Sequence, residues 1–276
     1  MFRRARRLAH FFSPKQLADP DTEWSRLRLQ ILLGFVVVVA TALVVGGAWS
    51  VVNMLNSSAA SAGSGSKAGK SAHDQLAERR LPGAPVEAAQ PGSLSSGETG
   101  TIAIPAPTEV GEVGVATGYP QTPEGALAQL AAIDTTALTS ASVRVAQEVI
   151  KEWAAPGGPT SESWTGVQAV AAFLESAGMP AEAGSSITIA VEPKMGFIKG
   201  TVGDDFVVPC IDFIITATTT TGQPQQVAAA DCQRMVWQDG RWVIGEGDEP
   251  APAPSLWPGS QASFDAGYQW LEVEQS

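Results

Sequence analysis

Histidine is nearly absent from this sequence of 276 residues, which contains only His10 and His73. Both precede the part of the chain whose pattern predicts a folded domain. Histidine-activated nucleophiles and imidazole zinc sites are therefore excluded there. No glycine-rich phosphate-binding loop precedes a helix. We expect no catalytic, cofactor-binding or metal-ligating residues and a protein that is not an enzyme, although paired acids distant in sequence could still converge for glycoside cleavage.

Basic residues are scarce after residue 30. Residues 1–30 contain seven Lys or Arg against three acids, which leaves 10 basic and 25 acidic residues for the rest of the chain. Nucleic-acid binding requires cations that displace phosphate counterions. We therefore expect no direct nucleic-acid binding by the C-terminal part.

Charge is missing altogether from residues 29–66. Within this stretch, residues 31–52 (ILLGFVVVVATALVVGGAWSVV) would form a helix of about 33 Å, against a hydrocarbon layer of about 30 Å. Trp24 and Trp49 lie near its two ends, where aromatic rings favour the membrane interface. A buried core helix would not have two polar flanks, and a cleaved signal peptide has a shorter apolar region. The sequence predicts an uncleaved signal anchor.

The basic residues before this span set its orientation, because no basic residue follows it until Lys67. Positive residues stay on the cytoplasmic side. We expect a single-pass protein of the cell membrane with a basic cytoplasmic tail at residues 1–30 and all later residues outside the cell. The tail either forms an amphipathic helix on anionic lipid or serves only to orient the span.

Residues 53–117 are rich in Ser, Gly, Ala and Pro and have no sustained periodicity. Such composition predicts a flexible extracytoplasmic linker, with an r.m.s. span of about 40–50 Å. Within it, residues 101–107 (TIAIPAP) form a short strand or stay extended.

Residues 118–276 carry the signals of one folded domain, and helices come first. Thr122 followed by Pro123 is typical of a helix start. Thr139 or Ser140 would cap a second helix, and a third is expected at residues 161–176, with Gly178 just beyond it.

Strand patterns follow, rich in Val, Ile, Thr and aromatic residues. Asp239-Gly240 predicts a tight hairpin turn that places Trp237 opposite Trp242. A last short helix is expected from Ser260. The expected strands are 186–192, 196–202, 206–219, 226–237 and 242–245. This order indicates an α+β domain of about three helices packed on a curved antiparallel sheet.

Cys210 and Cys232 are the only cysteines, and both fall in predicted strands. The midpoint of 210 and 232 is 221, where Thr221-Gly222 would turn the chain. Opposed Cβ atoms in a hairpin lie about 4.5–5.5 Å apart. An extracytoplasmic location favours oxidation, so we expect a disulfide worth about 3 kcal/mol; the alternative is two buried thiols.

Two further groups of side chains are candidates for a metal site and an interaction surface. Glu246, Asp248 and Glu249 lie between glycines and prolines, which predicts a solvated loop rather than a calcium site. The C-terminal segment is aromatic and either packs back over a groove of the domain or forms an exposed interaction surface. The candidate residues of that surface are Trp257, Phe264, Tyr268 and Trp270.

Three sequence stretches carry a resemblance to a known family: GYPQTPEGALAQLAAID (118–134), DCQRMVWQDGRWVI (231–244) and PAPSLWPGS with AGY (252–268). They resemble membrane-anchored transfer proteins of actinobacterial conjugative elements. The overall plan is similar to the bitopic scaffold component of type IV secretion systems, including the TcpC type. The linker is longer than in that type, one such domain is expected rather than two, and the cysteine pair is not a family hallmark.

This resemblance implies a cone-like domain of the nuclear-transport-factor-two type that self-associates within a secretion channel. The implied function is a non-enzymatic scaffold of a conjugative DNA-transfer complex, with the lipid bilayer, other channel subunits and copies of itself as partners. The resemblance brings no catalytic residues. The alternative function is a membrane-tethered module that binds a small ligand or cell-wall component in the cavity of the cone.

Overall fold

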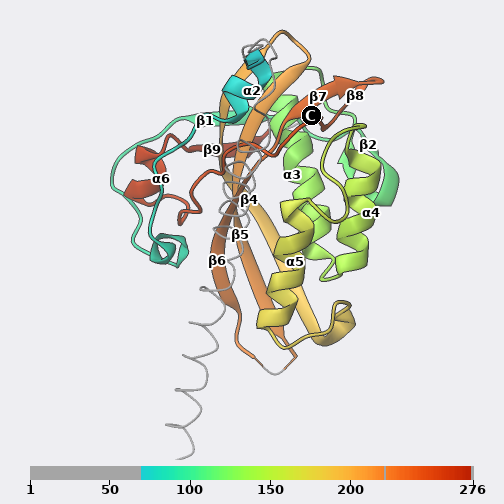
Figure 1. Ribbon diagram of the computed structural model, residues 1–276. Helices are drawn as coiled ribbons and strands as arrows, with labels where there is room; N and C mark the ends of the chain where they lie inside the picture. The colour runs from blue at the N-terminus through green and yellow to red at the C-terminus, as the bar shows by residue number, and fades with distance from the viewer. Residues whose placement is uncertain (1–69, 221, 275–276) are drawn as a thin grey trace, which may run out of the picture.

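Three helices cover one face of a strongly curled sheet in the computed structural model, which describes residues 70–220 and 222–274 (Figure 1). The helices are α3 (Pro123–Thr139), α4 (Val143–Trp153) and α5 (Thr165–Ser176). The sheet contains β1 (Thr101–Ile104), β4 (Ile187–Val202), β5 (Phe206–Thr219), β6 (Gln225–Cys232), β7 (Met235–Gln238), β8 (Arg241–Ile244) and β9 (Gln269–Val273). The predicted α+β class with a curved, mainly antiparallel sheet is confirmed.

The sheet has the order β1-β9-β4-β5-β7-β8, and β6 pairs with the far half of β5. All of these pairs are antiparallel except β1 with β9, which is parallel. The register of β4 against β5 shifts between Pro193 and Met195 and again between Ile198 and Gly200. Such bulges bend a strand and increase its twist, which curls the sheet around the helices as a half-barrel.

The helix starts follow local capping chemistry. Thr122 caps α3 by accepting a hydrogen bond from the Gly125 N–H, with proline at the first helical position, as predicted. The predicted cap of the second helix at Thr139 or Ser140 is wrong. The chain stays helical through Thr139, and Ser142 caps α4 by accepting from the Val145 N–H.

The strand boundaries differ from prediction at two places. Residues 186–192 and 196–202 belong to one bulged strand, β4, and the predicted strand at 226–237 is two strands, β6 and β7. The break between them holds Gln233 and Arg234, both buried. The predicted hairpin turn is confirmed, because Asp239 and Gly240 both have positive φ and Trp237 pairs with Trp242.

The C-terminal segment begins as predicted and then departs from prediction. Ser260 caps α6 (Gln261–Asp265), but that helix ends early and the chain returns as β9. Trp270 of β9 pairs with Met195 of β4 on one side and Thr101 of β1 on the other. A strand here was not predicted.

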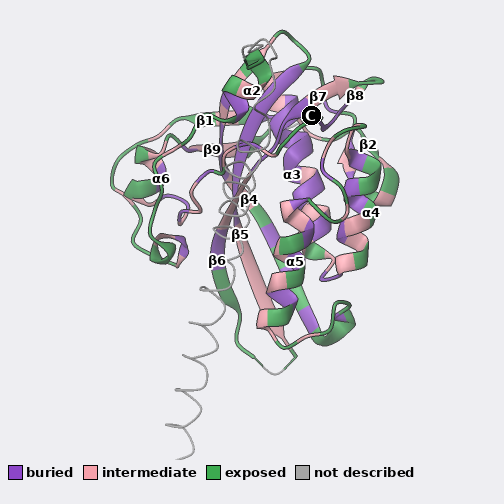
Figure 2. Ribbon diagram, in the orientation of Figure 1, coloured by how far each residue is buried: buried purple, intermediate pink, exposed green. Residues whose placement is uncertain are grey.

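Both faces of the central sheet are covered (Figure 2). The first eight residues of β5 are all buried, as in a strand that is packed on two sides. On the helix side, Ile211 and Phe213 join the main core. On the other side, Cys210, Phe197 and Tyr268 form a second core with residues of the C-terminal segment.

Residues 70–117 are part of the fold, so the predicted linker boundary at residue 117 is wrong. This segment contains α2 (Ala72–Ala77), η1 (Val86–Ala89), β1, β2 (Glu109–Val110), η2 (Glu112–Gly114) and β3 (Ala116–Thr117). A short 3-10 turn, η3 (Gly184–Ser186), lies later in the chain, ahead of β4. Leu76 and Ile104 are buried by contacts with distant strands. A search for local periodicity cannot detect such contacts, which is why the composition alone indicated disorder.

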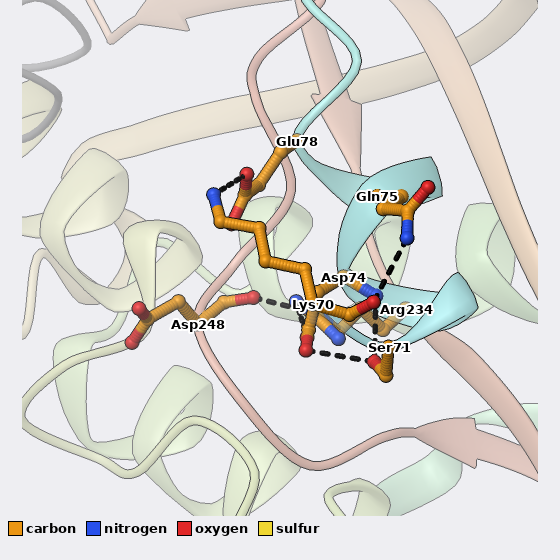
Figure 3. A network of polar contacts seen from close by, with 7 residues as sticks. All are labelled: Lys70, Ser71, Asp74, Gln75, Glu78, Arg234 and Asp248. Carbon is orange, nitrogen blue, oxygen red and sulfur yellow. Dashed lines mark hydrogen bonds and ion pairs between the residues drawn. The ribbon is translucent and has the colours of Figure 1, made fainter. Parts of the chain in front are cut away.

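Arg234 anchors the start of this segment to the sheet (Figure 3). Its guanidinium pairs with the Asp74 carboxylate of α2 at 2.9 Å and donates to the Asp248 carbonyl at 2.8 Å. The Arg234 side chain is 8% exposed. The His73 ring stacks on Phe206, with ring centroids 4.1 Å apart.

None of the helices within residues 70–220 and 222–274 is long and apolar enough to cross a membrane. The predicted span at residues 31–52 and the predicted cytoplasmic tail at 1–30 lie outside the described residues.

Candidate functional site

A mainly apolar pocket of about 90 Å³ lies between α3, α5 and the strands β4, β5 and β6. One water needs about 10–15 Å³ of such a volume, so the pocket can hold a small ligand or several waters. Its apolar walls include Leu138, Val170, Phe173, Phe213 and Val227. A few polar groups converge on this lining, which is the usual constitution of a ligand site.

Asp134 lies on the fourth turn of α3 and is only 4% exposed. It lines the pocket, and its Oδ2 has no hydrogen-bond partner among the described residues. Burial raises the pKa of the Asp134 carboxyl well above its ordinary value, and the charges of Asp231 and Glu249 raise it further. Burial therefore favours the neutral form of the Asp134 carboxyl.

Asp231 of β6 faces the same pocket. Burial raises its pKa to about 6, against the opposing effect of a hydrogen bond from Gln233. The Gln233 amide donates to Asp231 Oδ2 at 3.0 Å and also reaches Glu249 Oε2 at 3.5 Å. Gln233 thus joins the two carboxyl groups.

Glu249 caps the N-terminus of α5 from a loop 84 residues away. Its Oε1 accepts from the Thr165 backbone N–H at 2.8 Å, and its Oε2 accepts from the Thr165 hydroxyl. Trp164, at the N-cap position, makes no side-chain cap bond, so Glu249 supplies the acceptor that the helix start lacks. Burial, and then the Asp231 charge, raise the pKa of Glu249 to about 7.

The prediction that Glu246, Asp248 and Glu249 form a solvated loop is thus correct for the first two, which are exposed, and wrong for Glu249. No local sequence signal could have shown this. A carboxylate that caps a helix from 84 residues away is placed by the tertiary fold.

Trp164 lines the pocket and is fully buried. Its indole Nε1 has no hydrogen-bond acceptor among the described residues. The indole also explains Gly166, because a Cβ at that position would lie about 2.5 Å from a ring atom. The start of α5 is thus built around this ring.

The Cys210–Cys232 disulfide holds the strand that carries Asp231. The two cysteines are directly opposed in the β5–β6 ladder, as the midpoint argument predicts, and the S–S distance is 2.03 Å. Cys232 lies between Asp231 and Gln233. The disulfide therefore fixes the two polar residues at this end of the pocket.

Asp212 is a second buried carboxyl, on the opposite face of β5, and is fully buried. Neither of its oxygens makes a hydrogen bond of ordinary geometry within the described part of the chain, and burial raises its pKa well above the ordinary value. Burial, followed by the nearby Asp212 charge, also raises the pKa of Tyr268. Asp212 does not line the pocket.

The C-terminal aromatic residues pack against the domain, which is the first of the two alternatives that the sequence left open. Tyr268 is fully buried and its hydroxyl donates to the Pro254 carbonyl at 3.0 Å. Phe264 meets Trp270 edge to face, and Trp257 packs beside Val227 and Ala228. These rings close the second core because Phe197 and Cys210 leave an apolar surface on that face.

Asp134 and Asp231 therefore form the acidic end of the pocket, and Gln233 joins Asp231 to Glu249 outside the lining. None of these three acids was a predicted site residue. Within the described ranges, no group of three or more His, Cys, Asp or Glu side chains is arranged to hold a metal ion. Comparisons with protein-family models, with curated proteins and with solved structures find no match to this chain.

Proposed function

We propose that this chain is a membrane-tethered protein whose outer domain binds a small ligand in the pocket between α5 and the sheet. The observation that carries the proposal is the pair of unpartnered polar groups in an apolar pocket, Asp134 Oδ2 and Trp164 Nε1. Leaving a buried polar group without a partner costs about 1–3 kcal/mol. A ligand that supplies the missing partners recovers this cost.

The proposed tether is the apolar stretch at residues 31–52, with residues 1–30 in the cytoplasm and the folded domain outside the cell membrane. The cystine is consistent with this placement, because disulfides persist in oxidising compartments.

Binding rather than catalysis is proposed because two of the three acids are already engaged. Glu249 caps α5 and Asp231 accepts from Gln233, which leaves Asp134, of these three acids, with an oxygen that has no partner among the described residues.

The test uses the full chain in nanodiscs of uncharged lipid, with ligand-observed ¹⁹F NMR of 4-fluorobenzyl alcohol and of 4-fluorobenzylamine. Ala169 lines the pocket on α5, whereas Ala171 on the same helix is exposed. Ala169→Leu should fill the pocket and abolish binding of whichever probe binds, and Ala171→Leu should leave it unchanged. Absence of binding by both probes, or equal binding by the two variants, would contradict the proposal.

A second function, the non-enzymatic scaffold of a conjugative or type IV secretion-like complex, is proposed from the resemblance and from the edges of the sheet. We propose further that the curled sheet and its three helices are of the nuclear-transport-factor-two type. Strand β1 is the last strand of the sheet, and Thr101 and Ala103 on it are exposed. An unpaired strand edge can add a strand of another copy or of a channel subunit.

Mass photometry of the full chain in nanodiscs tests self-association through this edge. Ala103→Lys should reduce the oligomer, because a lysine on an edge strand opposes pairing, and Ala171→Lys should not. A chain that is monomeric before any substitution would rule out self-association through β1.

A further inference from the structure

We propose that the ligand of this pocket is a small organic cation, a protonated amine on a compact apolar body. This inference rests on the proposed binding function and adds the chemical class of the ligand. The feature that carries it is the combination of carboxyl groups, aromatic rings and missing basic residues in one lining.

Among the described residues that line the pocket, the ionisable side chains are all acidic. Asp134 and Asp231 line it, and Glu249 lies behind them, near enough to raise the pKa of Asp134. Among the described residues that line the pocket there is no Lys, Arg or His. Lys199 lies near Asp231, but its ammonium donates to the Ala251 carbonyl outside this lining. An anion would meet only like charge here, whereas a cation would meet opposite charge in a site of low dielectric.

The apolar part of the lining also suits a cation. Trp164, Phe173 and Phe213 all contribute to the walls. Aromatic rings attract organic cations placed over them, and this attraction grows when the site is desolvated. The remaining wall residues are aliphatic, so a ligand with a hydrocarbon body removes that surface from water on binding.

The unpartnered Asp134 Oδ2 gives the expected direction of the polar end. The carboxyl is 4% exposed and has no donor at this oxygen within the described part of the chain. An ammonium N–H supplies that donor and neutralises the carboxylate, which makes a charge-assisted hydrogen bond. A neutral alcohol could instead donate to Asp134 and accept from Trp164 Nε1, and it is therefore the rival ligand that the test must separate.

Binding of a cation should release protons. The charges of Asp231 and Glu249 act on Asp134. Lys199 and Glu249 interact with the charge of Asp231, whose carboxylate accepts from Gln233, and Asp231 also raises the pKa of Tyr268 in the second core. Neutral carboxyl groups ionise when an ammonium arrives, and the protons go to the buffer. Affinity for the amine should consequently rise between about pH 5.5 and pH 8, and affinity for an alcohol should not.

The experiment compares 4-fluorobenzylamine with 4-fluorobenzyl alcohol, which share one body and differ in the charged group. On the full chain in uncharged nanodiscs at pH 7.5, we expect the amine to bind about tenfold more tightly than the alcohol. Asp134→Asn and Asp231→Asn should each weaken amine binding about tenfold and leave alcohol binding nearly unchanged. Asp248→Asn removes the same charge from an exposed position of the neighbouring loop and should have no effect.

Two measurements keep the result interpretable. Thermal unfolding of each variant identifies one that fails to fold, and calorimetry of the unsubstituted chain in two buffers of different ionisation enthalpy counts the protons released. Alcohol binding as tight as amine binding, unchanged amine affinity in both folded Asn variants, or absence of proton release overturns the cation assignment but leaves the pocket function standing. Failure of both probes to respond to Ala169→Leu overturns the pocket function itself.

Discussion

Four carboxyl groups of this domain lie at positions where burial disfavours their charged form. Asp134, Asp231 and Glu249 converge from a helix, a strand and a loop, and Asp212 is buried on the other side of the sheet. When the pKa of a carboxyl group is higher in the folded than in the unfolded protein, the group is more protonated in the folded state at pH values between the two pKa values. These acids therefore reduce stability once the pH exceeds their ordinary pKa.

The sign of the resulting pH dependence can be stated for two of them. The pKa of Asp231 rises from 3.8 to about 6 and that of Glu249 from 4.5 to about 7. Stability should fall as the pH rises from about 4 to 7 and then level off, by at most about 3–3.5 kcal/mol per group, since one pKa unit corresponds to about 1.4 kcal/mol. Chemical denaturation across this pH range measures the slope.

Asp231→Asn and Glu249→Gln should each flatten that slope, and Asp265→Asn, at the exposed last residue of α6, should not. A domain that grows more stable between pH 4 and 7 would contradict the assignment of raised pKa values.

Asp212 offers a separate prediction, because its carboxyl lies in the second core without a hydrogen bond of ordinary geometry among the described residues. Asp212→Asn keeps the size of the side chain and removes the ionisable proton. At pH 8 this variant should be more stable by about 1–2 kcal/mol, since asparagine has no carboxyl group whose ionisation is opposed by burial. At pH 4 the two proteins should unfold at nearly the same denaturant concentration, and a loss of stability at pH 8 would refute the explanation.

At the scale of elements, α2 depends on one arginine. Arg234 pairs with Asp74 and binds the Asp248 carbonyl (Figure 3). Leu76 and Ala77 supply buried apolar contacts, and His73 stacks on Phe206. Arg234→Ala leaves α2 with these apolar contacts alone and should weaken its attachment to the sheet. Trypsin should then cleave after Arg79 or Arg80 at least about fivefold faster, because local opening exposes the backbone.

The matched variant is Arg241→Ala, which removes another part-buried arginine, one stacked on Trp153. It should leave cleavage near α2 unchanged. Equal rates in the Arg234→Ala and unsubstituted proteins would show that α2 is held by its apolar contact alone.

The elements that the sequence predicted correctly are those with local causes. Thr122 followed by Pro123 starts α3, Asp239-Gly240 turns the β7–β8 hairpin, and Cys210 and Cys232 meet because the strands turn midway between them. Those that it missed have distant causes. Strand β9 forms because β1 and β4 flank it, and Glu249 functions as a helix cap only because the loop after β8 passes the start of α5 in the fold.

The acidic end of the pocket was missed for the same reason. Asp134 lies on the core side of an alanine-rich helix, and its sequence context gives no sign that the carboxyl is buried. The acids of the pocket come from distant parts of the sequence and meet only in the tertiary fold. The capping and turn residues, in contrast, are neighbours in the sequence.

At the scale of the whole molecule, the Cys210–Cys232 disulfide joins β5 and β6 of the sheet. Reduction, or replacement of both cysteines by alanine, should lower the free energy of unfolding by about 3 kcal/mol. Urea denaturation with and without dithiothreitol measures this, and the double-alanine variant should no longer respond to the reductant. Unchanged stability after complete reduction would contradict the prediction.

The topology of the whole chain gives another prediction. In intact cells, protease added outside should remove the folded domain, and a periplasm- or surface-active reporter fused after residue 274 should be active. A reporter that is active only in the cytosol would overturn the proposed orientation, whose physical basis is that arginines do not cross a bilayer.

The adjacency of Cys232 to Asp231 and Gln233 has one more consequence. The bond that joins β6 to β5 also fixes the acidic end of the pocket, so in the proposed function oxidation of the two cysteines would complete the ligand site. A molecule on the reducing side of the membrane would lack the disulfide, and the acidic end of its pocket would not be fixed. Ligand binding would then begin only after export.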